Sequence, residues 1–285
     1  MYLSKKQNLL VLIFLFVFSL SSKAQINDYA NVQEGEFGIT IGSANYYGDL
    51  NTTADLTHSK LAFGLFFRKQ LGNYVAVRLA GHYAQLGYSD SYSKNDFQQH
   101  RNLSFNTDIY EVALLGDFNF LRFIPGDKDY SFTPYASIGI GMFSYDPYTY
   151  YKNEKVYLRQ LNTEGQSFYQ DRKPYGTTAF SFPIAFGIKY AMSEKITISA
   201  EFAYRFTTTD YLDDVSTTYA GINNFPLSGG SPSLASILQD RSYEVGTPIG
   251  VEGRQRGFSK QKDQFSIIEL GVSINIMSYR CPTAR

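Results

Sequence analysis

The sequence predicts an all-β protein, an eight-stranded antiparallel β-barrel that crosses a membrane. Eight segments alternate apolar with small or polar residues, and this two-residue period is typical of strands. The connections between these segments are alternately short and long. After residue 24 no apolar run is long enough for a spanning helix, so the chain can reside in a membrane only through strands.

The N-terminus has the three parts of a secretory signal peptide. Lys5 and Lys6 precede an uncharged apolar run at residues 9–20, and Ser22 and Ala24 place small residues at positions −3 and −1 of a cut after Ala24. The alternative is a membrane anchor, but this run is shorter than the roughly 20 residues that a spanning helix needs. We therefore predict a cleaved signal peptide, residues 1–24, followed by a barrel domain, residues 25–285.

Charge and cysteine content exclude two classes of protein. The chain has 26 Lys and Arg residues against 26 Asp and Glu residues, so it lacks the basic excess that nucleic-acid phosphates require. Its one cysteine, Cys281, cannot form a disulfide framework, and a dimer through Cys281 is the one disulfide left open. We expect no nucleic-acid partner.

The first four predicted strands each place apolar side chains on one parity. They are residues 36–44, with Phe37, Ile39 and Ile41; residues 61–68, with Leu61, Phe63, Leu65 and Phe67; residues 75–84, with Val75, Val77 and Leu79; and residues 108–120, with Tyr110, Val112 and Leu114. The other parity carries glycines and polar side chains such as His82. Each strand therefore has one apolar face.

The last four predicted strands repeat the pattern. They are residues 132–143, with Ile138, Ile140 and Met142; residues 180–190, with Phe182, Ile184, Phe186 and Ile188; residues 196–206, with Ile198, Ala200, Phe202 and Tyr204; and residues 265–277, with Ile268, Leu270, Val272, Ile274 and Ile276. Pro183 lacks an N–H group, so we expect a bulge or a break in strand pairing there. Gly139 and Gly141 do not lie in a complete nucleotide-binding motif. We interpret them as interior positions where strands or side chains approach closely.

The connections decide what covers the apolar face. Short turns are centred on residues 71–73, 125–127 and 192–194, whereas residues 46–60, 85–107, 144–179 and 207–264 form long loops. An even number of strands with this alternation is the plan of outer-membrane barrels, whose short turns face the periplasm. The apolar parity then faces lipid. Aromatic side chains near strand ends suit the interfacial girdles: Tyr46, Tyr47, Tyr130, Tyr145, Tyr190 and Tyr279.

Charged residues on the interior parity predict a plugged lumen. An eight-stranded barrel is just wide enough for its own side chains, so we expect no diffusion pore. Unpaired charges would be costly there, and we interpret these residues as structural ion pairs rather than a proton relay or catalytic groups. We expect His82 to be a hydrogen-bonded interior residue. The predicted charge network consists of Arg68, Arg78, Glu111, Lys189, Glu201, Arg205 and Glu269.

An Asp-rich block follows the seventh strand and permits two interpretations. Asp210, Asp213 and Asp214 could supply oxygen ligands to Ca²⁺, but their spacing is not that of an EF-hand loop. Asp213 or Asp214 could instead cap a short helical turn, with Ser216 and Thr217 bonding to local backbone. The preference of Asp for N-caps favours capping, and we predict no metal and no cofactor.

Three loop segments carry residues that a barrel alone does not require. They are Tyr46, Tyr47, Gly48 and Asp49; Thr163, Glu164, Gly165 and Gln166; and Asp210, Tyr211, Leu212, Asp213 and Asp214. With Arg256, Gly257 and Asp263, this order of motifs resembles the PorG-like outer-membrane proteins of the type IX secretion system of Bacteroidetes. The resemblance implies a barrel that ties the periplasmic ring of the PorK lipoprotein and PorN to the outer membrane, in support of secretion and gliding motility.

Two other functions remain open from the residues alone. A surface adhesin or receptor would use the tyrosine-rich loop at residues 145–175, because tyrosine side chains are enriched at protein interfaces. A lipid-modifying enzyme would need a nucleophile and a base at the outer rim, where His58 with Ser59, or His100, are the candidates. Neither histidine stands at a spacing from a nucleophile and an orienting group that is typical of a catalytic site, so we expect no enzymatic activity.

Overall fold

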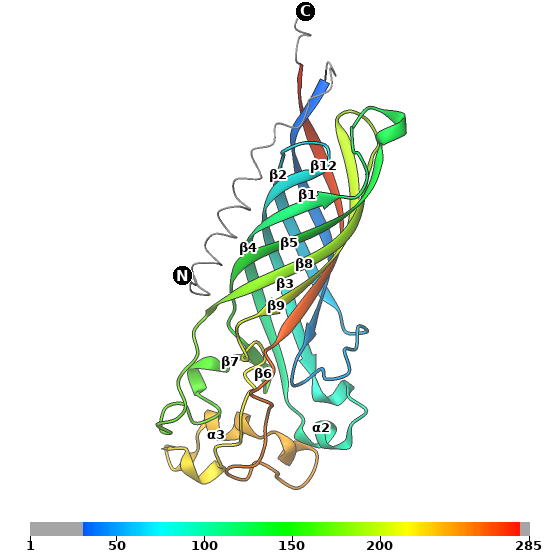
Figure 1. The fold of residues 1–285 in the computed structure, drawn as a ribbon. Helices are drawn as coiled ribbons and strands as arrows, with labels where there is room; N and C mark the ends of the chain where they lie inside the picture. Colours follow the sequence, from blue (N-terminus) through cyan, green and yellow to red (C-terminus); the bar gives the residue numbers. More distant parts are fainter. Residues whose placement is uncertain (1–30, 280–285) are drawn as a thin grey trace, which may run out of the picture. The chain divides into compact units, whose positions relative to one another are not determined.

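The computed structural model describes residues 31–279, and eight of their strands close into a barrel (Figure 1). In ring order β3-β2-β1-β12-β9-β8-β5-β4, each strand pairs with the next, and β4 pairs back onto β3. The barrel strands are β1 (Asn31–Tyr47), β2 (Lys60–Gln70), β3 (Val75–Ser89), β4 (Ser104–Asn119), β5 (Phe132–Ser144), β8 (Thr178–Ala191), β9 (Ile196–Thr207) and β12 (Gln264–Tyr279). The predicted fold class is confirmed. The predicted signal peptide and Cys281 lie outside the described residues.

The barrel and its loops belong to one compact unit, Gln33–Met277. Its neighbouring barrel strands pair in antiparallel register, and the β5–β8 ladder is interrupted at Pro183. Pairing runs to Ile138↔Ile184 and resumes at Gly141↔Ser181 without a change of register, while Pro183 stays paired with Arg205 of β9. The expected break is therefore present, and no extra residue is inserted.

The outside of the barrel is apolar, the reverse of a soluble sheet. Side chains of the predicted apolar parity point outward, and Ile138 and Leu270 are 67% and 65% exposed. Because hydrocarbon on this scale must be kept from water and a closed barrel leaves no free edge, the architecture is that of an outer-membrane β-barrel. No helix in the described ranges is long and apolar enough to cross a membrane.

Two of the tyrosines expected in the lipid-facing girdles lie inside instead. Tyr46 and Tyr145 are 2% and 4% exposed, because their positions fall on the interior parity at the loop ends of β1 and β5. Tyr190 is exposed as expected, and Tyr47 and Tyr130 are half-buried. The side chain of Tyr279 lies outside the described part of the structure.

The four long connections gather at one end of the barrel, at the bottom of Figure 1, and we call them the cap: residues 48–59, 90–103, 145–177 and 208–263. Its short elements are η1 (Asp90–Tyr92), α2 (Asp96–Arg101), β6 (Tyr148–Tyr151), β7 (Glu154–Tyr157), η3 (Arg159–Leu161), η4 (Ile222–Asn224), β10 (Leu227–Ser228), β11 (Ser231–Pro232), α3 (Leu234–Gln239) and η5 (Ser242–Glu244). Helix α2 begins where Asn95 accepts from the Phe97 and Gln98 N–H groups, and ends at Asn102 in the left-handed region.

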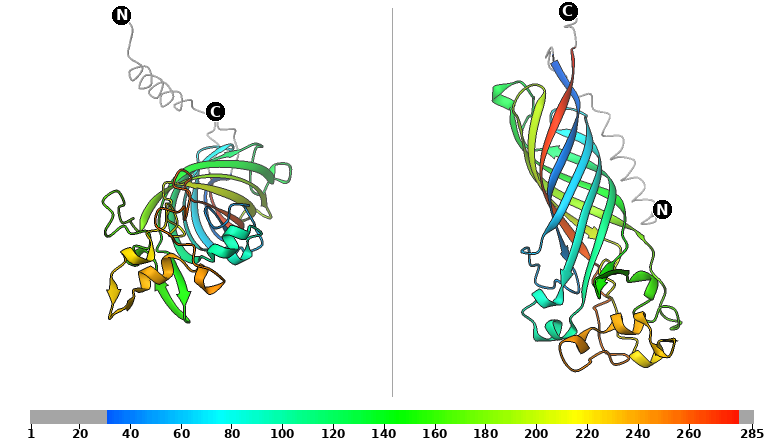
Figure 2. Two further views of the ribbon diagram at one scale, coloured as in Figure 1. Left: turned by 90° about the horizontal axis from the view of Figure 1, so that it is seen from below. Right: turned by 180° about the vertical axis from the view of Figure 1, so that it is seen from behind.

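The main apolar core lies where the cap meets the barrel. Leu86, Phe105, Phe143, Leu212 and Phe265 are among its buried members, contributed by strands and loops alike. The opposite end carries three turns, of which residues 120–131, with η2 (Lys128–Tyr130), form the longest. The turns and the cap thus lie at opposite ends of the barrel (Figure 2). By the rule for such barrels, the turns face the periplasm and the cap faces outward.

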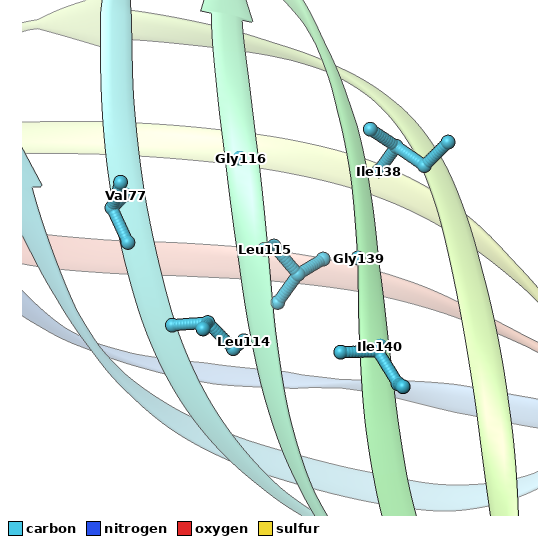
Figure 3. Close-up of a pocket in the computed structure, with 7 residues that line it drawn as sticks. All are labelled: Val77, Leu114, Leu115, Gly116, Ile138, Gly139 and Ile140. Atoms are coloured by element: carbon cyan, nitrogen blue, oxygen red, sulfur yellow. The ribbon is translucent and has the colours of Figure 1, made fainter. Parts of the chain in front are cut away.

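A shallow apolar hollow of about 400 Å³ lies against β3, β4 and β5 (Figure 3). Val77, Leu114, Ile138 and Ile140 surround Gly116, which has no side chain to fill the space. All four surrounding side chains belong to the exposed apolar surface. Since this surface meets lipid, the hollow is filled by hydrocarbon and is not a site for a polar ligand.

Candidate functional site: the barrel interior and the cap

Two arginines organise the interior at the periplasmic half of the barrel. Arg68 bonds both Glu36 and Asp117, and Arg78 lies 2.8 Å from Glu201 and 3.4 Å from Asp117. All five side chains are buried. Sequence analysis missed Glu36 and Asp117, although both stand on the interior parity of their strands. They complete the pairing that the predicted residues alone would leave open.

A second interior cluster lies nearer the cap and centres on Glu111. Its carboxylate accepts from Arg205 at 2.8 Å and from the Ser181 hydroxyl at 2.6 Å. His82 lies 3.4 Å from Glu111 and 3.6 Å from Glu269, one carboxylate at each ring nitrogen. His82 is thus an interior residue held by polar contacts, as expected from the sequence.

Lys189 departs from the predicted ion pairing. Its Nζ has no hydrogen-bond partner within the described part of the chain, and it lies 5.0 Å from the centre of the Tyr135 ring and 5.2 Å from that of Phe123. The nearby carboxylates of Glu36 and Asp117 are already bonded to Arg68. The ammonium group therefore faces aromatic rings in place of a carboxylate.

Glu164 joins distant parts of the cap. Its carboxylate accepts from the N–H groups of Ser216 and Thr217 at 2.9 and 3.0 Å and from the Thr217 hydroxyl at 2.7 Å. Arg256 donates to the same carboxylate at 3.1 Å. Gly165 follows with φ +78°, a conformation that favours glycine and turns the chain back so that Gln166 can accept from the Glu164 N–H.

Asp214 is the second carboxylate of this network. It accepts from Thr163 and, at 2.6 Å, from the hydroxyl of Tyr175, while Arg256 lies 3.6 Å away. Burial raises the pKa of Asp214 to about 6, and the positive charge of Arg256 opposes that rise. The Tyr175 ring stacks on Tyr211 with centroids 4.4 Å apart.

A third group joins the first loop to the end of the fourth. The Tyr46 hydroxyl lies 2.6 Å from Asp213 and 3.0 Å from Asp263, and the Leu212 N–H donates to Asp263 at 2.9 Å. Burial raises the pKa of both carboxyls well above the ordinary range. Gly48 makes this approach possible, because a Cβ there would lie 2.0 Å from Asp263 Oδ1.

Asp49, which is half-buried, and Asp210, which is buried, are two further carboxyls of the cap with raised pKa values. Asp49 accepts from the Phe258 N–H at 3.0 Å, and Asp210 accepts from the Ser216 hydroxyl at 2.5 Å. Burial raises the pKa of Asp49 to about 6 and that of Asp210 to about 7. Both groups therefore bind protons more tightly than an exposed carboxyl.

The Asp-rich block does not form the predicted helix cap. The next helical turn, η4, begins only at Ile222, with Gly221 before it. The Asp213 carboxylate accepts from the Val215 N–H at 2.9 Å in a local turn instead. Ser216 and Thr217 bond Asp210 and Glu164, which sequence reasoning could not foresee because Glu164 belongs to another loop. Among residues 31–279 no group of side chains is arranged to hold a metal ion.

The structure brings nearly all of the loop motif residues together. Tyr46, Gly48, Asp49, Thr163, Glu164, Gly165, Gln166, Asp210, Tyr211, Leu212, Asp213 and Asp214 line the cap interior or its contacts. Tyr47 is the exception. It lies at the rim, where its hydroxyl is 2.9 Å from that of Ser266 and its ring stacks on Tyr204.

The rim histidines have structural partners. The Ser59 hydroxyl lies 2.5 Å from the Asn45 side-chain oxygen and 2.8 Å from the Leu56 carbonyl, and His58 Nδ1 lies 3.0 Å from the Thr57 hydroxyl. His100 Nε2 bonds the Thr247 carbonyl at 2.8 Å. Neither histidine is hydrogen-bonded to a serine in these contacts.

Comparison with known proteins adds a family and several similar structures. Residues 6–225 match the family model described as "Domain of unknown function (DUF6089)". No curated protein matches the sequence. Similar solved structures include the N-terminal β-barrel domain of Pseudomonas aeruginosa OprF (11% identity, 86% of this chain and 100% of that chain, TM-score 0.37) and Neisserial surface protein A (8%, 87% and 100%, 0.42). The attachment invasion locus protein Ail of Yersinia pestis, in complex with sucrose octasulfate, is another (13%, 85% and 99%, 0.38).

Proposed function

The chain belongs to the DUF6089 domain family, and we propose that it is a non-enzymatic outer-membrane barrel of the type IX secretion system. In this proposal it docks the periplasmic ring of PorK and PorN to the outer membrane. The observation that carries it is the convergence of the motif residues. Segments that resemble PorG-like proteins, and that lie far apart in the sequence, share one buried network around Glu164, Asp214 and Arg256.

The chemistry of this network supports a scaffold. Each carboxylate in it is held by backbone N–H groups, hydroxyls or Arg256, so its side chains are used to fix loops. An enzyme would need a nucleophile within hydrogen-bond reach of a base. Ser59 is bonded to Asn45 and Leu56, and His58 to Thr57, which favours a non-enzymatic role.

The periplasmic turn at residues 120–131 is the best candidate for the ring contact among the described residues. It is longer than the other two turns, and it exposes Lys128 and Asp129 within η2. Charged, exposed side chains at a rim control association and can be reversed without loss of a folded core. A ring subunit that docks at this end of the barrel would contact this turn.

Co-purification tests the proposal. Tagged protein is extracted from outer membranes in mild detergent, and PorK and PorN are quantified in the eluate. We expect Lys128→Glu with Asp129→Lys to lower their recovery about tenfold, since like charges would then oppose docking. The matched control is Asp171→Lys with Lys173→Glu, the same reversal at exposed sites of the cap.

Two results together would refute ring docking. They are the absence of both subunits from the wild-type eluate and intact type IX secretion in a deletion strain. Loss of recovery in the cap control alone would move the contact to the other face of the membrane and contradict a periplasmic docking turn.

A surface adhesin or receptor is the second candidate. The third loop exposes Tyr150, Tyr157 and Phe168, with Tyr150 55% exposed. Aromatic side chains of this kind are enriched at protein interfaces. Protease treatment of whole cells that removes this loop would abolish binding to a surface partner but leave the co-purification of PorK and PorN unchanged.

A further inference from the structure

A cavity of about 300 Å³ opens at the outer rim of the barrel, between the first loop and the ends of β3 and β4. It forms because neighbouring strands end at different heights. The β2–β3 register ends at Ala62↔Ala84, whereas β3 and β4 remain paired as far as Ser89↔Ser104. Residues 85–89 at the end of β3 therefore pair with β4 but not with β2.

Three aromatic rings form one wall of this cavity. His58 and Tyr92 are stacked, with centroids 3.6 Å apart and planes inclined by 7°, and Tyr88 meets both rings edge-on. Tyr92 keeps 47% of its surface accessible. A flat ring that is fixed in place and still exposed is a platform for the apolar face of a ligand, at little cost in conformational entropy.

The hydrogen bonds of His58 determine which ring nitrogen is available. The Thr57 hydroxyl donates to Asp55 at 3.0 Å, so it can only accept from His58 Nδ1, also at 3.0 Å. Asp55 lies 3.3 Å from the same nitrogen and cannot donate when ionised. Nδ1 therefore carries a hydrogen, and Nε2 is left to contact a ligand.

Lys60 supplies the positive charge of the cavity. It is the first residue of β2 and half-buried, and within residues 31–279 its Nζ forms no ion pair. The cavity lining also includes the polar side chains of Ser89 and Asn106. A mixed cavity with an unpaired ammonium group favours an anionic ligand with several hydroxyls.

We propose that this cavity binds a phosphorylated sugar. The sugar ring lies against Tyr92, the phosphate is held by Lys60, one ring hydroxyl donates to His58 Nε2, and the other hydroxyls bond the polar side chains of Ser89 and Asn106. Lysine is a common phosphate ligand. The position at the outer rim gives access both to sugars in solution and to the headgroups of glycolipids in the outer leaflet.

Isothermal titration of the full-length protein in detergent tests the site. The probes are glucose 1-phosphate, glucose and inorganic phosphate. We expect saturable binding of glucose 1-phosphate, at least about tenfold tighter than that of either part alone. Lys60→Met and Tyr92→Ala should each weaken it about tenfold or more, because one removes the charge and the other the platform.

Matched controls separate the site from general effects. Lys173→Met and Tyr150→Ala change the same residue types at exposed cap positions and should bind as the wild type does. Retention of the compact, heat-modifiable band on gels shows that each variant is folded.

The source of the ligand is distinguished by nanodiscs with and without diphosphorylated lipid A. Competition by lipid A against glucose 1-phosphate supports a glycolipid headgroup, and binding of the free sugar phosphate without competition supports a soluble ligand. The proposal is overturned if neither glucose 1-phosphate nor lipid A binds saturably. It is also overturned if Lys60→Met and Tyr92→Ala bind these probes like the wild type.

Discussion

Glu164 shows how one buried side chain can join loops that are distant in sequence. Its donors, Ser216, Thr217 and Arg256, lie 52, 53 and 92 positions away. From the sequence alone, the neighbouring Asp-rich block offered a calcium site or a helix cap, because only local partners can be weighed there. The resemblance to a family singled out these segments but did not pair them, because their pairing depends on the closed barrel.

Three carboxyls of the cap with raised pKa values predict a pH-dependent stability. Asp210, Asp49 and Asp214 have folded-state pKa values of about 7, 6 and 6, above the roughly 3.9 of an unfolded chain. A raised pKa means that the folded cap holds protons more tightly, so its extra stability is present at low pH and is lost as pH rises through these values. We expect the cap to be cleaved by protease several times faster at pH 8 than at pH 5.

Asp210→Asn tests the cause of this pH dependence. The amide oxygen can still accept from Ser216, but the group no longer titrates, so the difference between pH 5 and pH 8 should shrink. Asp171→Asn, at an exposed site of the same cap, should leave the difference unchanged. The cleavage rates are corrected for the pH dependence of the protease itself. Equal corrected rates at pH 5 and pH 8 in the wild type would contradict the prediction.

At the scale of elements, the two-residue period located all the barrel strands but not their loop ends. Strand β3 runs on to Ser89 and β4 begins at Ser104, where the pattern is broken by polar residues such as Gln85 and Asn106. Their outer ends rise into the cap, above the lipid, so the apolar signal is lost although pairing continues. The hairpin β6–β7 was missed for the same reason.

Gly48 lets the first loop pack closely against the fourth loop of the cap, and its replacement should loosen the cap without opening the barrel. Gly48→Val would force its side chain into Tyr46 and Asp263, where even a Cβ lies within 2.1 Å of the Tyr46 hydroxyl. Overpacking of this kind costs about 1–3 kcal/mol. We expect faster hydrogen exchange in residues 208–263 and unchanged exchange in the strands.

Gly176→Val is the matched control for this loop substitution. Its Cβ would meet only one backbone atom, at 3.9 Å, so hydrogen exchange in the cap should stay as in the wild type. If Gly48→Val is as silent as Gly176→Val, the tight approach around Asp263 does not hold the loops.

For the whole molecule, the apolar outer face and the charged lumen have one cause, which is that successive residues of a strand point to opposite faces of the barrel wall. The sequence was sufficient to place Arg68, Arg78, Glu111, Lys189, Glu201, Arg205 and Glu269 inside, because an odd or even position fixes the face of a strand. It was not sufficient to pair them, because partners across the lumen depend on strand stagger and on side-chain reach. Lys189, which meets rings instead of a carboxylate, illustrates that limit.

The lumen network predicts that breaking one interior ion pair, and leaving a buried charge without its partner, strongly destabilises the barrel. Arg205→Ala would leave Glu111 buried without its 2.8 Å partner, at a cost of about 3–5 kcal/mol. Arg205→Met combined with Glu111→Gln should recover much of that loss, since the remaining groups are neutral. Urea titration in detergent, read by the heat-modifiable band, gives each midpoint.

The exposed pair of Lys69 and Glu34, 3.5 Å apart, provides the reference for these interior substitutions. Lys69→Ala removes a solvated ion pair, which contributes at most about 1 kcal/mol. If Arg205→Ala were as mild as Lys69→Ala, water would have to reach Glu111 and replace its partner. The interior would then be a hydrated channel, and the same variant should show stepwise ion conductance in planar bilayers, so the two measurements together decide between a packed and a wet lumen.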